Sequence, residues 1–270
     1  MAFHLRVLSL FLLFFLFCSV EAKAQELYLS KKNNQVDDTL RVGLVLSGGG
    51  AMGIAHIGVI QAIEEAGIRI DYITGTSMGS LVGGLYAIGY TSDQLAEMAT
   101  SNNFVELFTE KPDRKYISNY EKIIDDRTIV TFPISEKSID LPVGIISGQN
   151  IYTYLARLTQ SVHGIEEFDD FPIPFAAVAT DLETGEAKVF RSGYLPDALR
   201  ASISIPSLFS PHNIDGKLYV DGGLIRNLPV QDAIEMGADY TIAVDVSSPL
   251  MPKDSLNTFA KVLNQSVFFR

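Results

Sequence analysis

Strand-like apolar runs and apolar residues at helical spacing alternate along the first half of the chain. A short apolar run at residues 41–46 is followed, after a glycine loop, by apolar residues at helical spacing between residues 54 and 63. Gly67 comes next, and a glycine at that place is typical of a helix C-terminus. A second strand-like run at residues 68–73 leads into a helix-forming run at residues 80–88. Strands and helices that alternate with short links indicate a mostly parallel α/β sheet.

The same alternation returns in the second half of the chain. Helices are predicted at residues 149–158 and 195–202, and strands at residues 175–180, 187–190, 217–220 and 240–245. Between the two halves, residues 102–141 mix aromatic and charged side chains without a clean period. This segment is either a cap or substrate-facing insertion, or a pair of surface helices with loops.

The N-terminal residues differ from this core. Residues 1–24 combine Arg6, an apolar stretch at residues 7–17 and an Ala-Lys-Ala cleavage site, which is the pattern of a secretory signal peptide. The apolar stretch is short for a transmembrane helix, and an uncleaved anchor is the alternative interpretation. We therefore predict export, to the periplasm, the outer membrane or the medium.

Three further boundaries follow from the pattern. Residues 25–39 are polar, residues 40–250 are expected to form one folded domain, and residues 251–270 have the spacing of an amphipathic C-terminal helix. This apolar helix runs to the last residue, which is compatible with a longer full-length protein.

Composition narrows the possible partners. The chain has 270 residues and a formal net charge of −11, which argues against binding to nucleic acid or electrostatic docking on anionic lipid. Any lipid contact is therefore expected to be apolar. The single cysteine, Cys18, lies in the leader after the bulky Phe17, so we expect neither lipid attachment there nor a disulfide in the mature chain.

The stretch Gly75-Thr76-Ser77-Met78-Gly79 places a serine between two glycines, after a strand and before a helix. This is the sequence form of a nucleophile elbow, a sharp turn that presents the serine hydroxyl. Glycines at 75 and 79 remove the side chains that would collide across such a turn. Ser77 is therefore the candidate nucleophile.

The glycine loop has two interpretations. Gly48, Gly49, Gly50 and Gly53 match the G-x-G-x-x-G pattern of dinucleotide sites, and Asp71 lies near the place of a ribose-binding acid. That interpretation predicts an oxidoreductase. Alternatively, three consecutive glycines at a helix N-terminus present backbone N–H groups to an anion, such as a tetrahedral oxyanion. The serine that follows favours the oxyanion hole.

A serine nucleophile needs a base, and no histidine is well placed for this role. His4 is in the leader, His56 lies inside the first helix, and His163 sits in a polar loop. His212 is the best histidine candidate.

The carboxylate alternative for the base is Asp221, at the end of a strand. Gly222 and Gly223 follow it and allow another backbone to approach closely. Since the carboxyl ends of parallel strands converge at one edge, Ser77 and Asp221 are both expected there.

Other acids have structural interpretations. Asp181 and Glu183 follow a strand and are expected to hold a turn, and Asp245 is expected to cap a loop at the last strand.

Taken together, these residues resemble the patatin-like phospholipases. The three ordered motifs are Gly48-Gly49-Gly50-x-x-Gly53, Gly75-x-Ser77-x-Gly79 and Asp221-Gly222-Gly223. Shorter blocks at residues 179–182, 201–206 and 227–230 also look like that family. The resemblance spans residues 42–247, so residues 40–250 are expected to form a patatin-like hydrolase domain.

The resemblance implies a three-layer α/β/α sandwich with a mostly parallel central sheet. It also implies a Ser–Asp dyad without a catalytic histidine, with Ser77 as nucleophile, Asp221 as base and the glycine loop as oxyanion hole. No metal or cofactor is implied. Many bacterial members carry Arg or Lys where this chain has Met52, a departure that puts the level of activity in doubt more than the activity itself.

The expected function is hydrolysis of a lipid acyl ester, of the phospholipase A or lysophospholipase type, through an acyl-enzyme. The expected partners are a lipid or acyl-ester substrate and, transiently, a membrane surface. Two alternatives stay open: the oxidoreductase, and a non-catalytic exported module on the same scaffold.

Overall fold

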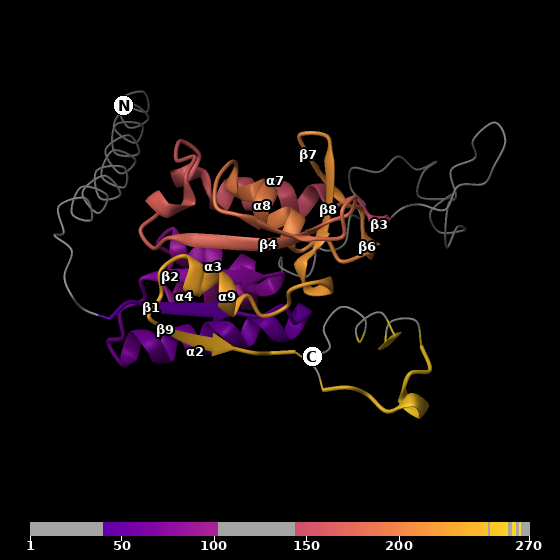
Figure 1. The fold of residues 1–270 in the computed structure, drawn as a ribbon, viewed down its shortest axis with the longest axis horizontal. Coiled ribbons are helices and arrows are strands. Elements are labelled where there is room, and N and C mark those ends of the chain that lie inside the picture. Colours follow the sequence, from indigo (N-terminus) through magenta and orange to yellow (C-terminus); the bar gives the residue numbers. More distant parts are fainter. Residues whose placement is uncertain (1–39, 102–143, 248, 259–260, 263–264, 266–270) are drawn as a thin grey trace, which may run out of the picture.

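The structure is a computed structural model that describes residues 40–101, 144–247, 249–258, 261–262 and 265 (Figure 1). The elements before the first gap are β1 (Val42–Leu46), the 3-10 helix η1 (Gly50–Ile54), α2 (Ala55–Glu65), β2 (Tyr72–Thr76), α3 (Met78–Ala87) and α4 (Ser92–Thr100). The elements after it are β3 (Gly144–Ile146), α7 (Gln149–Leu158), η3 (Gln160–Val162), η4 (Phe168–Asp170), β4 (Phe175–Asp181), β5 (Ala187–Phe190), α8 (Leu195–Ser202), β6 (Ser207–Phe209), β7 (His212–Ile214), β8 (Lys217–Asp221), η5 (Gly222–Leu224), α9 (Val230–Glu235), β9 (Tyr240–Val244) and η6 (Lys253–Ser255).

The central sheet is mixed. Its strands lie in the order β7-β8-β4-β2-β1-β9, and β5 also pairs with β4. The pairs β1–β2, β1–β9 and β2–β4 are parallel, whereas β5 and β8 run antiparallel to β4 and β7 runs antiparallel to β8. The parallel half is the α/β sheet that the sequence predicts, and the antiparallel half extends it.

Strand β4 brings two other strands end to end. Along one edge it pairs with β2 up to Thr76↔Val178, and then with β8 from Ala179↔Asp221 onward. Both lie on the same edge, because β5 pairs with residues 177–180 and so occupies the opposite edge at both places. Since β2 is parallel and β8 antiparallel to β4, the carboxyl ends of β2 and β8 face each other.

The two faces of the sheet are covered by different helices. In β1, Leu44 and Leu46 belong to the main core, where α3 and α8 pack on β4 (Figure 1). Val45, between them, points to the opposite face and packs with Ala233 and Ala238, near α9. This alternation follows from the two-residue period of a strand. Helices on both sides of the sheet make the α/β/α arrangement.

The sequence predicts several elements with their boundaries. Helices at 149–158 and 195–202 and the strand at 187–190 are confirmed residue for residue. The second strand is misplaced: it was expected at 68–73 but spans Tyr72–Thr76. Pairing with β1 begins at Gly43↔Tyr72, and the Asp71 carboxylate accepts the Val42 N–H at 2.9 Å just before it. The strand therefore begins at Tyr72, and residues 68–71 lie outside it.

Other elements were not predicted. These are α4, α9 and the three-residue strands β3, β6 and β7. Helix α4 has a signal that periodicity overlooks, because Thr91 and Gln94 form a capping box at its start.

Several predictions lie outside the described residues. They concern the leader at 1–24, the polar segment at 25–39, the segment at 102–141 and nine of the twenty residues at 251–270, where the C-terminal helix was expected. In the described part of that last range, residues 253–255 form η6. Among the helices that are described, none is long and apolar enough to cross a membrane.

Two glycines in neighbouring helices provide a matched test of close packing. A Cβ at Gly79 would lie 2.3 Å from the Leu46 carbonyl oxygen, whereas a Cβ at Gly58 would meet nothing within 4 Å. We expect Gly79→Ala to lower the free energy of unfolding by about 3 kcal/mol. Gly58→Ala should leave it unchanged or raise it by about 0.5–1 kcal/mol. Urea unfolding of both variants checks this, and equal effects would contradict the packing at Gly79.

Candidate active site

Ser77 occupies a strained turn between β2 and α3. Its backbone dihedrals are φ 52° and ψ −124°, which few residues with a side chain adopt. The turn is tight enough to need glycine on both sides. A Cβ at Gly75 would lie 2.5 Å from the Gly79 carbonyl oxygen. This is the elbow that the sequence predicts.

Hydrogen bonds fix the backbone of Ser77. Its N–H donates to Ser202 Oγ at 2.9 Å, and Ser202 Oγ donates in turn to the Val178 carbonyl at 2.6 Å. The Ser77 carbonyl accepts both the N–H and the hydroxyl of Ser80, at 2.9 and 2.7 Å. The main chain is thus anchored on both sides, and the hydroxyl remains for Asp221.

Asp221 lies opposite Ser77. Ser77 Oγ donates to Asp221 Oδ2 at 2.5 Å, a length typical of a hydrogen bond from a hydroxyl to a carboxylate. The other carboxylate oxygen accepts the Gly223 N–H at 2.8 Å. The Asp221 N–H donates to the Ser204 carbonyl at 2.9 Å. Both carboxylate oxygens and the backbone are therefore held.

The route by which Asp221 reaches Ser77 differs from the predicted one. We expected both residues at the shared carboxyl edge of parallel strands, but β8 is antiparallel to β4. The two residues meet because the carboxyl ends of β2 and β8 face each other along β4. Gly222 permits this approach, since a Cβ there would lie 2.3 Å from the Val178 carbonyl oxygen.

Burial changes the acidity of Asp221. The residue has no exposed surface, and this burial raises the pKa of its carboxyl from 3.8 to about 7. The hydrogen bonds from Ser77 and the Gly223 amide act in the opposite direction and limit the rise. A carboxylate with such a pKa is a far stronger base than an exposed aspartate.

The glycine loop lies beside the serine. A Cβ at Gly48 would be 3.1 Å from Ser77 Cβ, so Gly48 contacts the elbow directly. The Gly48 N–H donates to the Asn227 carbonyl at 3.1 Å. In the described part of the chain, no acceptor is bonded to the N–H of Gly49 or Gly50. Of the three amides predicted to hold an oxyanion, Gly49 and Gly50 are therefore free to do so, and Gly48 is engaged.

The remaining motif residues shape the loop. Gly53 packs against the residue after the serine, since a Cβ there would lie 2.3 Å from Met78 Cγ. Met52, where many bacterial family members carry a basic residue, is 43% exposed.

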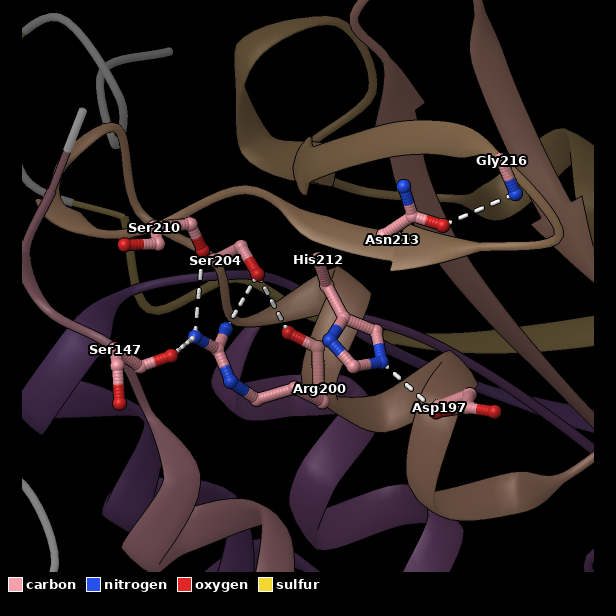
Figure 2. A network of polar contacts seen from close by, with 8 residues as sticks. All are labelled: Ser147, Asp197, Arg200, Ser204, Ser210, His212, Asn213 and Gly216. Carbon is pink, nitrogen blue, oxygen red and sulfur yellow. Dashed lines mark hydrogen bonds and ion pairs between the residues drawn. The ribbon is translucent and has the colours of Figure 1, made fainter.

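The described histidines make other contacts. His56 is buried, and its Nε2 lies 2.8 Å from the Ser47 carbonyl. His163 contacts Thr159 and Tyr194. His212 Nε2 points to Asp197 (Figure 2), and it lies 2.8 Å from Oδ1 of that carboxylate. None of these rings is hydrogen-bonded to Ser77, so the histidine alternative finds no support in the geometry.

The other acids also have structural partners. Asp181 Oδ1 accepts the N–H of Glu183 at 2.9 Å, which makes the predicted turn. Asp245 Oδ1 accepts the Ser247 N–H at 2.9 Å, which makes the predicted cap. Asp71 precedes β2 and pairs with Arg69 at 2.9 Å, so it lies at the amino end of the strand. In a dinucleotide-binding fold, the ribose-binding acid lies at the carboxyl end of its strand. The position of Asp71 therefore argues against the oxidoreductase interpretation. No cluster of metal ligands occurs within the described ranges.

Sequence reasoning gave no role to a buried arginine behind the site. Arg200, in α8, is 1% exposed, and its guanidinium points to Ser147, Ser204 and Ser210 (Figure 2). It donates to Ser204 Oγ at 2.5 Å and to the Ser147 and Ser210 carbonyls at 2.9 and 3.3 Å. Ser204 is the residue whose carbonyl holds the Asp221 N–H.

The loop after Asp221 was also given no role. The Thr76 and Thr74 hydroxyls donate to the Arg226 and Pro229 carbonyls, both at 2.9 Å. With the Gly48–Asn227 bond, these contacts join the loop to β2 and to the glycine loop. The blocks at 201–206 and 227–230 that resemble the patatin family thus support the Ser77–Asp221 pair and the glycine loop.

The fold and the site define an α/β protein with a buried serine–aspartate pair at a nucleophile elbow. Residues 44–234 match the family model "Patatin-like phospholipase". The chain therefore belongs to the patatin-like phospholipase family.

Named relatives give the same result at the level of sequence. The chain is 38% identical over 207 residues to an uncharacterised NTE family protein of Mycobacterium tuberculosis, covering 77% of this chain and 49% of that protein. It is 34% identical over 229 residues to "Lysophospholipase NTE1" of Meyerozyma guilliermondii, covering 83% of this chain and 14% of that protein. The chain thus spans about half or less of these relatives.

Solved structures with a similar fold have a lower sequence identity to this chain than these relatives. VipD from Legionella pneumophila is 18% identical, with a TM-score of 0.45 over 71% of this chain and 47% of that one. ExoU in complex with SpcU, from Pseudomonas aeruginosa, is 19% identical, with a TM-score of 0.43 over 85% of this chain and 49% of that one.

The raised pKa of Asp221 predicts a pH-dependent cost of folding. The folded state holds this proton more tightly than the unfolded chain, so stability falls as the pH rises from 3.8 to about 7. A shift of this size corresponds to at most about 4 kcal/mol. Asp221→Asn should therefore raise the melting temperature most at pH 9, less at pH 5, and little below pH 3.8. Asp239→Asn is the control, because hydrogen bonds from Arg41 lower the pKa of Asp239. The ionised form of Asp239 therefore stabilises the folded state, in contrast to that of Asp221.

The contacts of Arg200 predict a large loss of stability on its removal. Arg200→Met leaves a hydroxyl and two carbonyl acceptors without their donor in the interior, which should lower the free energy of unfolding by about 3 kcal/mol or more. Arg191→Met removes an ion pair with Asp169 in which both side chains are over 40% exposed. It should cost less than about 1 kcal/mol. Urea unfolding of both variants distinguishes the two cases.

Proposed function

We propose that this chain is a lipid acyl hydrolase that cleaves a carboxylic ester through an acyl-enzyme on Ser77. The observation that carries the proposal is the 2.5 Å hydrogen bond between Ser77 Oγ and the buried Asp221 carboxylate at a strained elbow. A nucleophile joined to a base in this way is the arrangement that acyl transfer needs.

In the first half of the reaction, Asp221 takes the proton of the Ser77 hydroxyl while Oγ forms a bond to the carbonyl carbon of the ester. The carbonyl oxygen becomes an oxyanion, for which the free amides of Gly49 and Gly50 are the donors. Such donors contribute about 10²–10³ in rate each. The bond to the alcohol then breaks, and the leaving alkoxide takes the proton from Asp221.

In the second half, a water molecule attacks the acyl-enzyme and gives a proton to Asp221. The tetrahedral intermediate collapses, the fatty acid leaves, and Ser77 Oγ recovers the proton. Asp221 acts as base and acid in both halves, which suits a group whose pKa is about 7.

Membership of the patatin-like phospholipase family supports a lipid as the source of the ester. The relative from Meyerozyma guilliermondii is named a lysophospholipase, and we extend that substrate class to this chain as part of the proposal. Export through residues 1–24 and transient contact with a membrane surface belong to the same proposal.

Labelling with a fluorophosphonate probe tests the nucleophile. The protein should be labelled, and Ser77→Ala should abolish labelling and lower hydrolysis of acyl esters by about 10³-fold or more. Ser101→Ala, at an exposed position, is the matched control and should behave like the native protein. Labelling that survives Ser77→Ala would remove Ser77 from this role. An intact fold that is neither labelled nor active on any ester would favour the non-catalytic module.

The pH dependence tests the base. Because Asp221 must be ionised, kcat/KM should rise about tenfold per pH unit below pH 7 and level off above it. Asp221→Asn should lose this activity at every pH. A rate that is independent of pH between 5 and 8 would contradict Asp221 as the base. Titration with NADH tests the remaining alternative, and no change in cofactor fluorescence is expected.

A further inference from the structure

Two successive peptide groups of the glycine loop are bonded differently. In the first group, the Ser47 carbonyl lies 2.8 Å from His56 Nε2. Its N–H, that of Gly48, donates to the Asn227 carbonyl at 3.1 Å. In the second group, the Gly48 carbonyl accepts from Asn227 Nδ2 at 3.4 Å. Its N–H, that of Gly49, is bonded to no acceptor in the described ranges. The first group is therefore closed at both ends, and the second is open at its N–H.

The bond from Asn227 sets the direction of this open N–H. A peptide group is planar and trans, so its C=O and N–H point in opposite directions. Since the Gly48 carbonyl is directed at the Asn227 carboxamide, the Gly49 N–H points away from that side chain. Gly49 has a ψ of 14°, and a ψ near zero places the N atoms of Gly49 and Gly50 on the same side of the Gly49 Cα–C bond. The two free amides are thus neighbours and form a small concave site for an anion.

Asn227 is fastened to the strand that carries the nucleophile. The carbonyl of the preceding residue, Arg226, accepts the Thr76 hydroxyl at 2.9 Å, and Thr76 is the last residue of β2. A Cβ at Gly48 would lie 2.5 Å from Asn227 Oδ1 and 3.1 Å from Ser77 Cβ. The carboxamide and the elbow therefore lie against the same glycine. Through Asn227, the direction of the free amide is fixed relative to Ser77.

The carboxamide of Asn227 is costly as a purely structural group. Its Oδ1 is buried, and within the described residues no donor reaches it. An unpaired buried acceptor costs about 1–3 kcal/mol. The bond of Nδ2 at 3.4 Å is long and offsets only part of this cost. A side chain with so little benefit for stability is typical of a functional site.

We propose that Asn227 is a positioning residue of the oxyanion hole, which directs the Gly49 amide at the reacting carbonyl and polarises it. This inference rests on the proposed function. Asn227 Nδ2–H, the peptide group between Gly48 and Gly49, and the oxyanion form a chain of hydrogen bonds. Donation to the Gly48 carbonyl makes the Gly49 N–H a stronger donor. The long bond from Asn227 shortens as the oxyanion forms, as hydrogen bonds of a catalytic site do.

Asn227→Ala tests this role through the split between kcat and KM. The variant keeps the main-chain carbonyl that binds Gly48 and loses only the carboxamide. The kcat for acyl esters should fall about 10- to 100-fold, because the oxyanion forms only after the substrate is bound. KM should stay within about twofold of the native value. The pH dependence should not move, since the Asp221 carboxylate is bonded to Ser77 and Gly223 and not to Asn227.

Asn213→Ala is the matched control. Asn213 Oδ1 accepts the Gly216 N–H at 3.0 Å in the turn between β7 and β8 (Figure 2), so this carboxamide also holds a loop glycine. Its removal should leave kcat and KM as in the native protein. Asn227→Asp is a second variant that keeps the shape of the side chain. Its kcat at pH 8 should fall by at least as much as that of Asn227→Ala, because a carboxylate oxygen then faces the Gly48 carbonyl.

A spectroscopic experiment separates this inference from the proposed function. In protein with isotope-labelled glycine, Asn227→Ala should shift the NMR resonance of the Gly49 amide, because the hydrogen bond to the Gly48 carbonyl belongs to the same peptide group. Asn213→Ala should leave this resonance in place. The shift in Asn227→Ala, without hydrolysis of any ester by the native protein, would support the role of Asn227 in directing the amide and overturn the proposed function. Hydrolysis that depends on Ser77, with an unchanged kcat and an unchanged Gly49 resonance in Asn227→Ala, would overturn this inference alone.

Discussion

The site depends on one feature of the sheet, the shared edge of β4. Because β2 and β8 pair with the same edge from opposite directions, their carboxyl ends meet there. The residues at those ends, Ser77 and Asp221, are thereby brought together. Helix α8 and the turn after it then fix both residues, since Ser202 holds the Ser77 amide and Ser204 holds the Asp221 amide. Ser77 and Asp221 thus have one common support, although 144 positions separate them in the chain.

The features that make Asp221 basic and hold Ser77 in the elbow also lower the stability of the fold. The elbow keeps Ser77 at a positive φ, and Asp221 is buried without any exposed surface. Both features cost folding free energy, and the surrounding hydrogen bonds and packed glycines hold them in place. The same burial gives the carboxyl a pKa near neutrality. The instability of the charged form in the folded state is therefore the physical origin of its strength as a base.

The sequence contained the parts of the site but not the way in which they meet. The elbow was predictable because glycine, serine and flanking elements follow each other locally. Asp221 does lie beside Ser77, as expected, but the reason expected for its position, a shared parallel edge, was wrong. Local patterns do not encode strand direction, which is decided by partners far along the chain. For the same reason, the engagement of the Gly48 amide by Asn227 could not be foreseen from three adjacent glycines. Three-residue strands such as β7 are too short to show the two-residue alternation of apolar and polar side chains that predicts a strand.

The contacts of the histidines show how the pair differs from a triad. His56 binds a backbone carbonyl and His212 binds Asp197, so both serve the scaffold. A triad obtains its base from imidazole, whose ordinary pKa already lies near neutrality. Here an aspartate reaches a similar pKa by exclusion of water. Its basicity therefore depends on packing, and whatever fills the space beside Ser77 affects it.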